Sequence, residues 1–308
     1  MAKNQITQLS IHPDAPFDFD YTAYSHGWVV LSPNVWNPER RELQRTERLA
    51  GGKVVSLLIQ GPGSVEKPEI RIEVSHSGKL SAGQEQEILA AVAHMFRVDE
   101  NFAEFYKLCK KQGRRWKNLA RGLGRLLRSP SVFEDVVKTI CTTNIQWGGT
   151  KRMVAALVET FGTAQDGNPA FKTFPTPHAI AEVPPERFGK MVSLGYRSDY
   201  IHLLARRVSS GELDLSALLD PAISTPELKK KLLAIKGVGN YAAATLLMLL
   251  GRYDELPVDS VFRQFVSKKY FNGERISDPE AQAIYAGWGK WKYLAYWFDI
   301  WEGFDEKV

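Results

Sequence analysis

Residues 232–262 contain a tight turn between two helical stretches, and this arrangement restricts the possible folds more than any other feature of the chain. Gly237 and Gly239 flank Val238, so the backbone can turn sharply with its amide groups exposed. The apolar run from Tyr241 to Leu250 predicts a helix whose first amides face the turn, and such a helix start attracts a phosphate. The pattern indicates either a phosphate-binding hairpin or a plain tight turn between packed helices.

A single carboxylate follows this hairpin. After the loop of residues 251–256, the tripeptide Pro257-Val258-Asp259 places Asp259 at the start of a further helix. The apolar residues behind it have helical spacing: Val261, Phe262, Phe265 and Val266. Asp259 is therefore a helix N-cap, a catalytic group, or both.

The charge and cysteine content limit the class of protein. The chain has 308 residues, 44% of them apolar, with 40 Lys and Arg against 35 Asp and Glu, so its net charge of +5 suits a polyanionic partner. Its two cysteines, Cys109 and Cys141, cannot form a zinc or iron–sulfur ligand set, and they indicate a reducing, intracellular setting. No secretory signal opens the chain, and no apolar run approaches the ~18 residues of a membrane span. We expect a soluble protein.

The pattern of apolar residues along the sequence changes near residue 83. Before this point, short apolar stretches between Gly, Pro and Asn turns predict an antiparallel sheet, with strands at Trp28–Leu31, Lys53–Ile59 and Ile70–Val74. After it, helical spacing dominates, and Ser224-Thr225-Pro226-Glu227 predicts the start of the helix that enters the hairpin. The predicted fold class is α+β, with a sheet domain (1–83) packed on a mainly helical domain (84–308).

Basic residues gather in two places. The first is the segment Lys107–Arg128, where they alternate with Trp116 and leucines, and the second is Lys229–Lys231 with Lys236 beside the hairpin. A solvated helix face is the ordinary explanation of such a run, and contact with DNA phosphates is the alternative.

The hairpin, its two helices and the Pro-Val-Asp that places Asp259 20 residues after Gly239 together resemble the helix-hairpin-helix (HhH-GPD) DNA glycosylase superfamily. The resemblance spans residues 96–297 and mixes features of the alkylpurine and 8-oxoguanine branches. Similarity to the 8-oxoguanine branch lies in Met95–Asp99 (shared with the alkylpurine branch), Leu126–Pro130, Ile140–Asn144, Leu194–Arg197 and Tyr285–Trp288. It implies a glycosylase core of two helical lobes, with the helix-hairpin-helix at about 225–250 and the catalytic loop at 251–263.

The resemblance also implies how DNA is bound. Glycosylases extrude the damaged nucleotide from the duplex and fill the gap that it leaves. Tyr196 would intercalate, Arg197 would hydrogen-bond the orphaned base, and Asn144 would occupy the vacated space; a core residue, a surface charge and a helix cap are the respective alternatives. Amides around Gly237, Val238 and Gly239 would bind a phosphate of double-stranded DNA.

Backbone oxygens of the hairpin form the second implied site. The carbonyls of Leu233, Ile235 and Val238 would hold a structural monovalent cation, since carbonyl oxygens suit a hard ion. No cofactor is implied for the chemistry itself, and no iron–sulfur cluster is expected.

For Asp259 the implied role is catalytic. As the base departs, the deoxyribose acquires oxocarbenium character, and a nearby carboxylate stabilises that charge and can orient or deprotonate a water. Bifunctional members carry a Lys two residues after the second hairpin glycine, where this chain has Tyr241. Lys236 precedes the turn, so we expect water to be the nucleophile.

The predicted base pocket consists of Tyr241, Thr245, Trp288 and Lys290. An aromatic at position 241 is typical of the alkylpurine branch, where it stacks on a cationic base, although a packed core Tyr is the alternative. Val261 replaces the His of the 8-oxoguanine branch, and Lys290 and Leu294 replace its Gln and Phe. The aromatic-rich end that includes Trp291, Tyr293 and Tyr296 either helps to form the pocket or belongs to the core.

The sequence thus predicts a monomeric, monofunctional base-excision-repair DNA glycosylase for alkylated purines, located with the chromosomal DNA, and cytoplasmic if bacterial. One alternative is a glycosylase for an oxidised or modified base with weak lyase activity from a displaced Lys236 or Lys290. Another is a helix-hairpin-helix protein that binds DNA without catalysis, in which Asp259 is dispensable.

Overall fold

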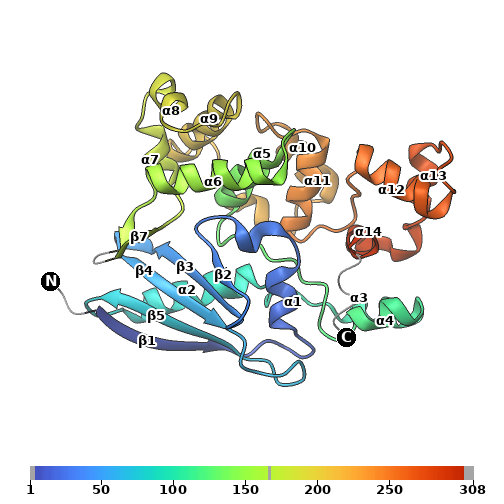
Figure 1. Cartoon of the computed structure of the whole chain (residues 1–308), viewed down its shortest axis with the longest axis horizontal. Helices are drawn as coiled ribbons and strands as arrows, with labels where there is room; N and C mark the ends of the chain where they lie inside the picture. The colour runs from blue at the N-terminus through green and yellow to red at the C-terminus, as the bar shows by residue number, and fades with distance from the viewer. Residues whose placement is uncertain (1–3, 166–167, 302–308) are drawn as a thin grey trace. The chain divides into compact units, whose positions relative to one another are not determined.

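The computed structural model describes residues 4–165 and 168–301. The chain forms two compact units. Figure 1 labels their helices and strands. Unit 1 contains Met1–Asn101 and Arg121–Leu215, and unit 2 contains Phe102–Ala120 and Ser216–Val308. The predicted α+β class is confirmed, because a sheet precedes a mostly helical remainder. The domain boundary near residue 83 is a different division of the chain, and it stays a prediction.

The sheet of unit 1 has five antiparallel strands in the order β1-β5-β4-β3-β2. These are β1 (Asn4–Ile11), β2 (Val35–Asn37), β3 (Glu42–Arg48), β4 (Val54–Gln60) and β5 (Ile70–Ser77). Register places Leu43 opposite Ile59, Ile59 opposite Ile72, and Ile72 opposite Leu9. Alternate residues of β5 are buried while Arg71 is exposed, so one face of the sheet carries the apolar core.

The sequence placed two strands correctly and misplaced a third. Lys53–Ile59 and Ile70–Val74 correspond to β4 and β5, but Trp28–Leu31 lies largely in the 3-10 helix η1 (Gly27–Val30). Trp28 Nε1 donates to Asp135 Oδ1 at 2.7 Å, and the Trp28 carbonyl accepts the Leu31 amide at 3.1 Å. These bonds turn the backbone locally, and a short apolar run does not reveal them.

Helices α1 and η2 lie between strands of the sheet in the chain, and the other helices of unit 1 listed here follow it, together with a short two-stranded ribbon. They are α1 (Phe19–Tyr24), η2 (Ala50–Gly52), α2 (Ala82–Met95), α5 (Val132–Thr142), α6 (Trp147–Phe161), α7 (Pro177–Ala181), α8 (Pro185–Met191) and α9 (Arg197–Ser209). The ribbon pairs β6 (Ala164–Gln165) with β7 (Asn168–Lys172). Helix α2 packs against β1 and starts with a capping box between Ser81 and Gln84.

A buried ion cluster joins the sheet to α5. Arg45 of β3 donates to both oxygens of Glu134, at 3.1 and 2.6 Å, and Lys138 Nζ lies 2.5 Å from the same carboxylate. Burial acts to raise the pKa of Glu134, but the Arg45 and Lys138 cations outweigh it and hold that pKa at about 2. An arginine can therefore stand in an otherwise apolar row of the sheet.

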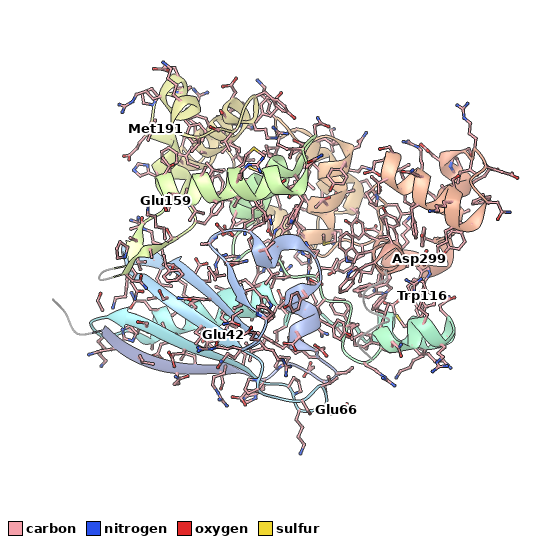
Figure 2. All side chains as sticks on the ribbon, in the orientation of Figure 1. Glu42, Glu66, Trp116, Glu159, Met191 and Asp299 are labelled. Atoms are coloured by element: carbon pink, nitrogen blue, oxygen red, sulfur yellow. The ribbon has the colours of Figure 1, made fainter. Side chains whose placement is uncertain are left out.

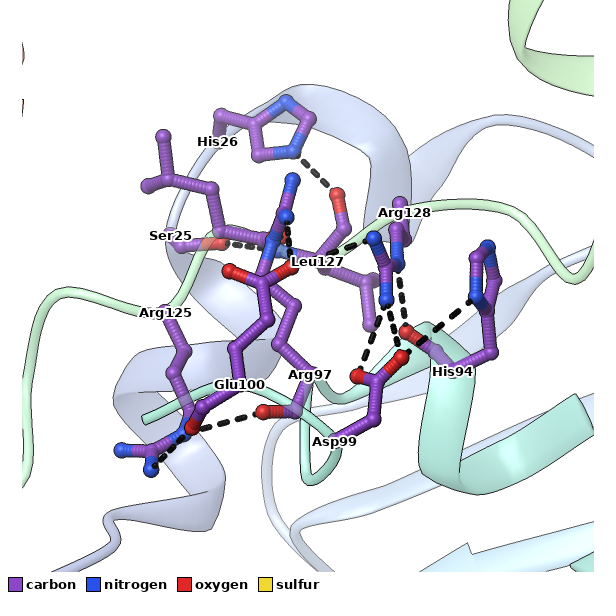
Figure 3. Close-up of polar contacts among 10 residues, drawn as sticks. Ser25, His26, His94, Arg97, Asp99, Glu100, Arg125, Leu127 and Arg128 are labelled. Carbon is purple, nitrogen blue, oxygen red and sulfur yellow. Dashed lines mark hydrogen bonds and ion pairs between the residues drawn. The ribbon is translucent and has the colours of Figure 1, made fainter. Parts of the chain in front are cut away.

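The two points where the chain passes between the units are tied together inside unit 1. We call this set the arginine clamp: Arg97, Arg125 and Arg128 with Asp99 and Glu100 (Figure 3). Arg128 Nη2 donates to both Asp99 oxygens at 2.9 Å, and Arg97 Nη1 donates to Glu100 at 2.6 Å. The clamp joins residues 97–100 to residues 125–128, on either side of the segment that belongs to unit 2.

Unit 2 is helical in its described part. It contains α3 (Ala103–Lys111), α4 (Arg114–Leu119), η3 (Ser216–Leu219), α10 (Thr225–Leu233), α11 (Asn240–Leu249), α12 (Ser260–Tyr270), α13 (Asp278–Ala283), η4 (Ala286–Trp291) and α14 (Lys292–Ile300). Asp299, labelled in Figure 2, is buried and accepts bonds from Arg115, Lys269, Tyr270 and Tyr285. No helix in the described residues combines the length and apolarity needed to cross a bilayer.

Candidate active site

Helices α10 and α11 form the predicted hairpin. A capping box between Ser224 and Glu227 starts α10, as the sequence predicts. Gly237 has φ 93°, a left-handed conformation that favours glycine, whereas Gly239 has φ −92° and is the N-cap of α11. A Cβ added to Gly239 would meet no atom within 4 Å. Only Gly237 is thus required by the turn itself, and Gly239 leaves open space in front of the helix start.

The hairpin is anchored by apolar side chains and by backbone bonds. Ile235 and Val238 are buried, and the Val238 amide donates to the Ile235 carbonyl at 3.0 Å. The Ala243 amide donates to the Gly239 carbonyl at 2.8 Å, which closes the first turn of α11. The first amides of a helix have no partner within it, so the start of α11 can bind an anion.

The three carbonyls predicted to hold a cation lie at the end of α10 and in the turn. Leu233 is the last residue of α10 and Ile235 and Val238 follow it, and the last carbonyls of a helix carry partial negative charge. The donor set fits a monovalent cation, because it consists of neutral oxygens only. The described residues contain no cluster of three or more His, Cys, Asp or Glu side chains that could hold a metal.

Asp259 is the N-cap of α12. Its Oδ1 accepts the Phe262 amide at 2.8 Å, and its own amide donates to the Pro257 carbonyl at 2.7 Å. The carboxylate is half-buried, between the buried Pro257 and the exposed Ser260. One backbone turn and one cap therefore fix the position of the carboxyl group, and the capping role that the sequence offered is present.

Two tyrosines of unit 2, Tyr293 and Tyr296, interact electrostatically with both Asp259 and Tyr241. Tyr241 is 44% exposed, whereas Tyr293 and Tyr296 of α14 are buried. Burial first, and then the charges of Tyr241 and Asp259 among others, raise the pKa of both Tyr293 and Tyr296. Both phenols thus stay neutral and can donate hydrogen bonds. The sequence placed them only in a group of aromatics, although their three-residue spacing puts both on one face of a helix.

Thr245 contributes to the same place through its hydroxyl. Its Oγ1 donates to the Tyr241 carbonyl at 3.1 Å, and Tyr293 is hydrogen-bonded to its side chain. Thr245 is 7% exposed, so it supports Tyr241 and Tyr293 from within the helix.

Trp288 and Lys290, the other predicted pocket residues, contact the segment of α3 and α4. Trp288 is buried, and its ring centre lies 4.6 Å from that of Trp116. Lys290 Nζ lies 2.5 Å from a Glu104 oxygen, and both side chains are exposed. Trp288 therefore packs in the core of unit 2, as one of the two interpretations of the aromatic-rich end proposes, whereas Lys290 forms an exposed ion pair.

Unit 1 brings together the residues predicted to fill the DNA gap. Asn144 follows α5 in a left-handed conformation, with φ 46°, and its Nδ2 lies 3.4 Å from the Tyr196 hydroxyl. Tyr196 is 48% exposed, whereas Arg197 is 5% exposed and donates to the Thr143 carbonyl.

The basic segment Lys107–Arg128 divides into two kinds of residue. Arg115, Arg125 and Arg128 are bonded to Asp299 or within the arginine clamp. The others are exposed: Lys107, Lys110, Lys111, Arg114, Lys117 and Arg121. Only this second set has the exposure that contact with phosphate requires.

Comparison with known proteins gives a consistent result. A putative DNA-3-methyladenine glycosylase of Bacillus subtilis is 24% identical over 293 residues, which cover 94% of this chain and 95% of the relative. The structure of a 3-methyladenine DNA glycosylase from Archaeoglobus fulgidus matches with a TM-score of 0.74 and 22% identity, covering 94% of this chain and 97% of that one.

A Clostridium acetobutylicum 8-oxoguanine glycosylase/lyase in complex with double-stranded DNA matches with a TM-score of 0.64 and 16% identity, covering 97% of each chain. At these identities the two structures show a shared fold. The model of the HhH-GPD superfamily of base excision DNA repair proteins matches residues 137–290, half of the chain and the part that contains the hairpin and Asp259. The protein therefore belongs to the HhH-GPD superfamily of base excision DNA repair proteins.

Proposed function

We propose that the protein is a monofunctional DNA glycosylase that hydrolyses the N-glycosidic bond of alkylated purines in duplex DNA. The observation that carries this proposal is Tyr241, an exposed aromatic ring in the first turn of α11. Tyr241 interacts electrostatically with the buried Tyr293 and Tyr296, and Asp259 interacts with the same two tyrosines. The names of the relatives support the substrate class, since they are 3-methyladenine glycosylases.

Asp259 is the proposed catalytic residue. The helix cap uses Oδ1, so we assign Oδ2 to the sugar or to the attacking water. A carboxylate held by the backbone needs little reorganisation when positive charge develops on the deoxyribose, and this is the condition for electrostatic stabilisation of a transition state. The same oxygen can accept a proton from the water that attacks the anomeric carbon.

Tyr241 is the proposed stacking surface for the extruded base. Alkylation at a ring nitrogen gives the purine a positive charge, and an electron-rich phenol ring attracts such a cation. Neutral Tyr293 and Tyr296 supply hydroxyl donors nearby, and Thr245 orients Tyr293. Trp288 and Lys290 remain predicted pocket residues, with the ring contact of Trp288 and the exposed ion pair of Lys290 described above.

Double-stranded DNA is the proposed partner of a protein acting as a monomer. The amides at Gly237, Val238 and Gly239 would bind a phosphate beside the lesion, and a cation at the Leu233, Ile235 and Val238 carbonyls would hold the turn in shape. In unit 1, exposed Tyr196 and Asn144 would fill the space of the extruded nucleotide. No group other than these side chains and water is assigned to the chemistry.

The test is mass-spectrometric detection of free bases released from alkylated, oxidised and deaminated duplex DNA. We expect wild type to release alkylated purines, and Asp259→Asn to lower the rate at least 100-fold. Asn can still accept the Phe262 amide, so the variant removes the charge while keeping the cap. Asp259→Ala loses both, and comparison of the two separates catalysis from stability.

Borohydride trapping in the same reactions distinguishes the alternatives. Hydrolysis by water leaves no covalent complex, whereas a displaced Lys236 or Lys290 nucleophile would be trapped on the DNA. Release of an oxidised base with trapping would contradict the proposal, and so would tight DNA binding without release of any base.

A further inference from the structure

Four residues from two helix ends meet on the surface of unit 1. Thr143 and Asn144 follow the last residue of α5, and Tyr196 and Arg197 begin α9; we call these four residues the wedge cluster. Gly195, just before Tyr196, has φ 59°, which turns the chain into α9. The Tyr196 hydroxyl is hydrogen-bonded to the side chains of Thr143 and Asn144. Hydrogen bonds within unit 1 therefore join the end of α5 to the start of α9 at this cluster.

Arg197 lies beneath the exposed ring of Tyr196. Its Cζ is 4.5 Å from the centre of that ring, which is close contact between a cation and an aromatic face. Its Nη2 donates to the Thr143 carbonyl, and the residue is only 5% exposed. The ring of Tyr200 also contacts that of Tyr196, with its centre 5.6 Å away in an edge-on arrangement. The ring is thus held by charge below and by an aromatic edge beside it.

A base-reading role conflicts with this geometry. To donate to the edge of an orphaned base, Arg197 would have to become exposed from its place under the Tyr196 ring, where it is 5% exposed and its Nη2 donates to the Thr143 carbonyl. The groups that are already exposed are the ring of Tyr196 and the side chain of Asn144. An aromatic ring stacks on every base, because every base has a π-face, so stacking distinguishes bases poorly.

We infer that Arg197 is a positioning residue that holds the Tyr196 ring for stacking, and that the protein does not distinguish the base opposite the lesion. This inference rests on the proposed function, because it assumes that the wedge cluster enters damaged DNA. It differs from what the resemblance implies for Arg197, and the difference comes from the contacts that this side chain makes.

The test measures binding to four duplexes that carry a tetrahydrofuran abasic analogue opposite A, C, G or T. We expect wild-type dissociation constants within about threefold of one another. Tyr196→Ala, at an exposed position, should weaken binding to all four about tenfold, in line with ~1–3 kcal/mol per stacked base. Arg197→Ala should weaken all four similarly, and it should add nothing further in the Tyr196→Ala background.

A second readout reports the position of the ring directly. With 2-aminopurine as the orphaned base, stacking on Tyr196 should quench its fluorescence, and Arg197→Ala should reduce the quenching although the tyrosine is still present. Arg197→Lys keeps the cation below the ring and should restore most of it. A merely structural role for Arg197 would change thermal stability and leave the quenching of the bound complex unchanged.

The inference is overturned if wild type prefers one opposite base tenfold or more and Arg197→Ala, but not Tyr196→Ala, removes that preference. The wild-type panel and Tyr196→Ala decide the matter even if Arg197→Ala does not fold. Binding to the abasic analogue requires no catalysis. Similar binding to the four duplexes without any base release would therefore contradict the proposed function alone. Absence of binding to every one of the four duplexes would contradict this inference.

Discussion

At the scale of single residues, the two hairpin glycines differ in what they do. Gly237 has a positive φ that the turn requires, but Gly239 has φ −92° and ψ −174°, which any residue adopts, and open space around it. The protein alone therefore gives no reason for glycine at position 239. Close approach of a DNA backbone would give one.

We predict that Gly239→Ala leaves the melting temperature unchanged but weakens binding to an abasic duplex tenfold or more, because its methyl group would meet the phosphate. Gly237→Ala is the matched control, and it should lower the melting temperature, since an L-residue is strained there by about 1–2 kcal/mol. Calorimetry and fluorescence anisotropy provide the two measurements. Unchanged DNA binding by Gly239→Ala would contradict a phosphate at this position.

The sequence predicted some of these residues better than others. Asp259 and the hairpin glycines are spaced along one short segment, so local patterns were sufficient to find them. Tyr293 and Tyr296 approach Asp259 only through tertiary packing of α14, and the sequence could not separate them from the core tryptophans around them. The contacts of Arg197 with Thr143 join segments 54 residues apart, so no local pattern contains them.

At the scale of elements, helix starts were predictable where the sequence contains a capping residue or a capping box. The capping box of α10 and the N-cap of α12 confirm this, because each depends on residues three positions apart. Strands β1, β2 and β3 and helix η1 were missed. The outer strand β1 alternates weakly with exposed Ile6, and η1 is set by distant partners such as Asp135.

Helix α2 provides a prediction about pH. His94 lies near its end, and burial followed by the Arg128 and Arg97 cations lowers the pKa of His94 to about 3 (Figure 3). The unfolded chain takes up this proton near pH 6.5 and the native protein does not, so stability is complete above pH 6.5 and is lost as the pH falls toward 3. Burial lowers the pKa of His26 to about 3 in the same way.

We predict that His94→Gln makes the free energy of unfolding less dependent on pH by about 1.4 kcal/mol per pH unit, the value for one proton, between pH 6 and 4. Gln is neutral throughout and tolerated in a helix. His178→Gln is the control for replacing a histidine by glutamine, at a side chain that is 72% exposed. Urea denaturation at several pH values measures it, and equal slopes for wild type and His94→Gln would contradict the shifted pKa.

At the scale of the whole molecule, the chain leaves unit 1 after Asn101 and returns at Arg121. We call residues 102–120 the excursion; unit 1 must fix the residues on either side of it, and unit 2 must fix the excursion itself. Unit 1 does so with the arginine clamp on both sides of it. Unit 2 does so with Asp299, which accepts Arg115 Nη1 from the excursion at 3.1 Å and Lys269 Nζ from α12 at 2.7 Å. Charge networks thus complete a topology that no local sequence pattern specifies.

Asp299→Asn should therefore destabilise unit 2 by about 1–3 kcal/mol, because it removes the buried carboxylate that bonds Arg115 and Lys269, whose own side chains are 27% and 32% exposed. Burial and then the Asp299 carboxylate raise the pKa of Tyr270, so this phenol stays a neutral donor and supplies no replacement charge. Lys290→Ala is the matched control, since it removes the exposed Lys290–Glu104 pair between η4 and α3 and should not shift the melting temperature measurably. Thermal unfolding of both variants decides the matter. If Asp299→Asn melts like wild type, a buried charge network does not hold the excursion, and apolar packing around Phe102 and Phe105 must be sufficient.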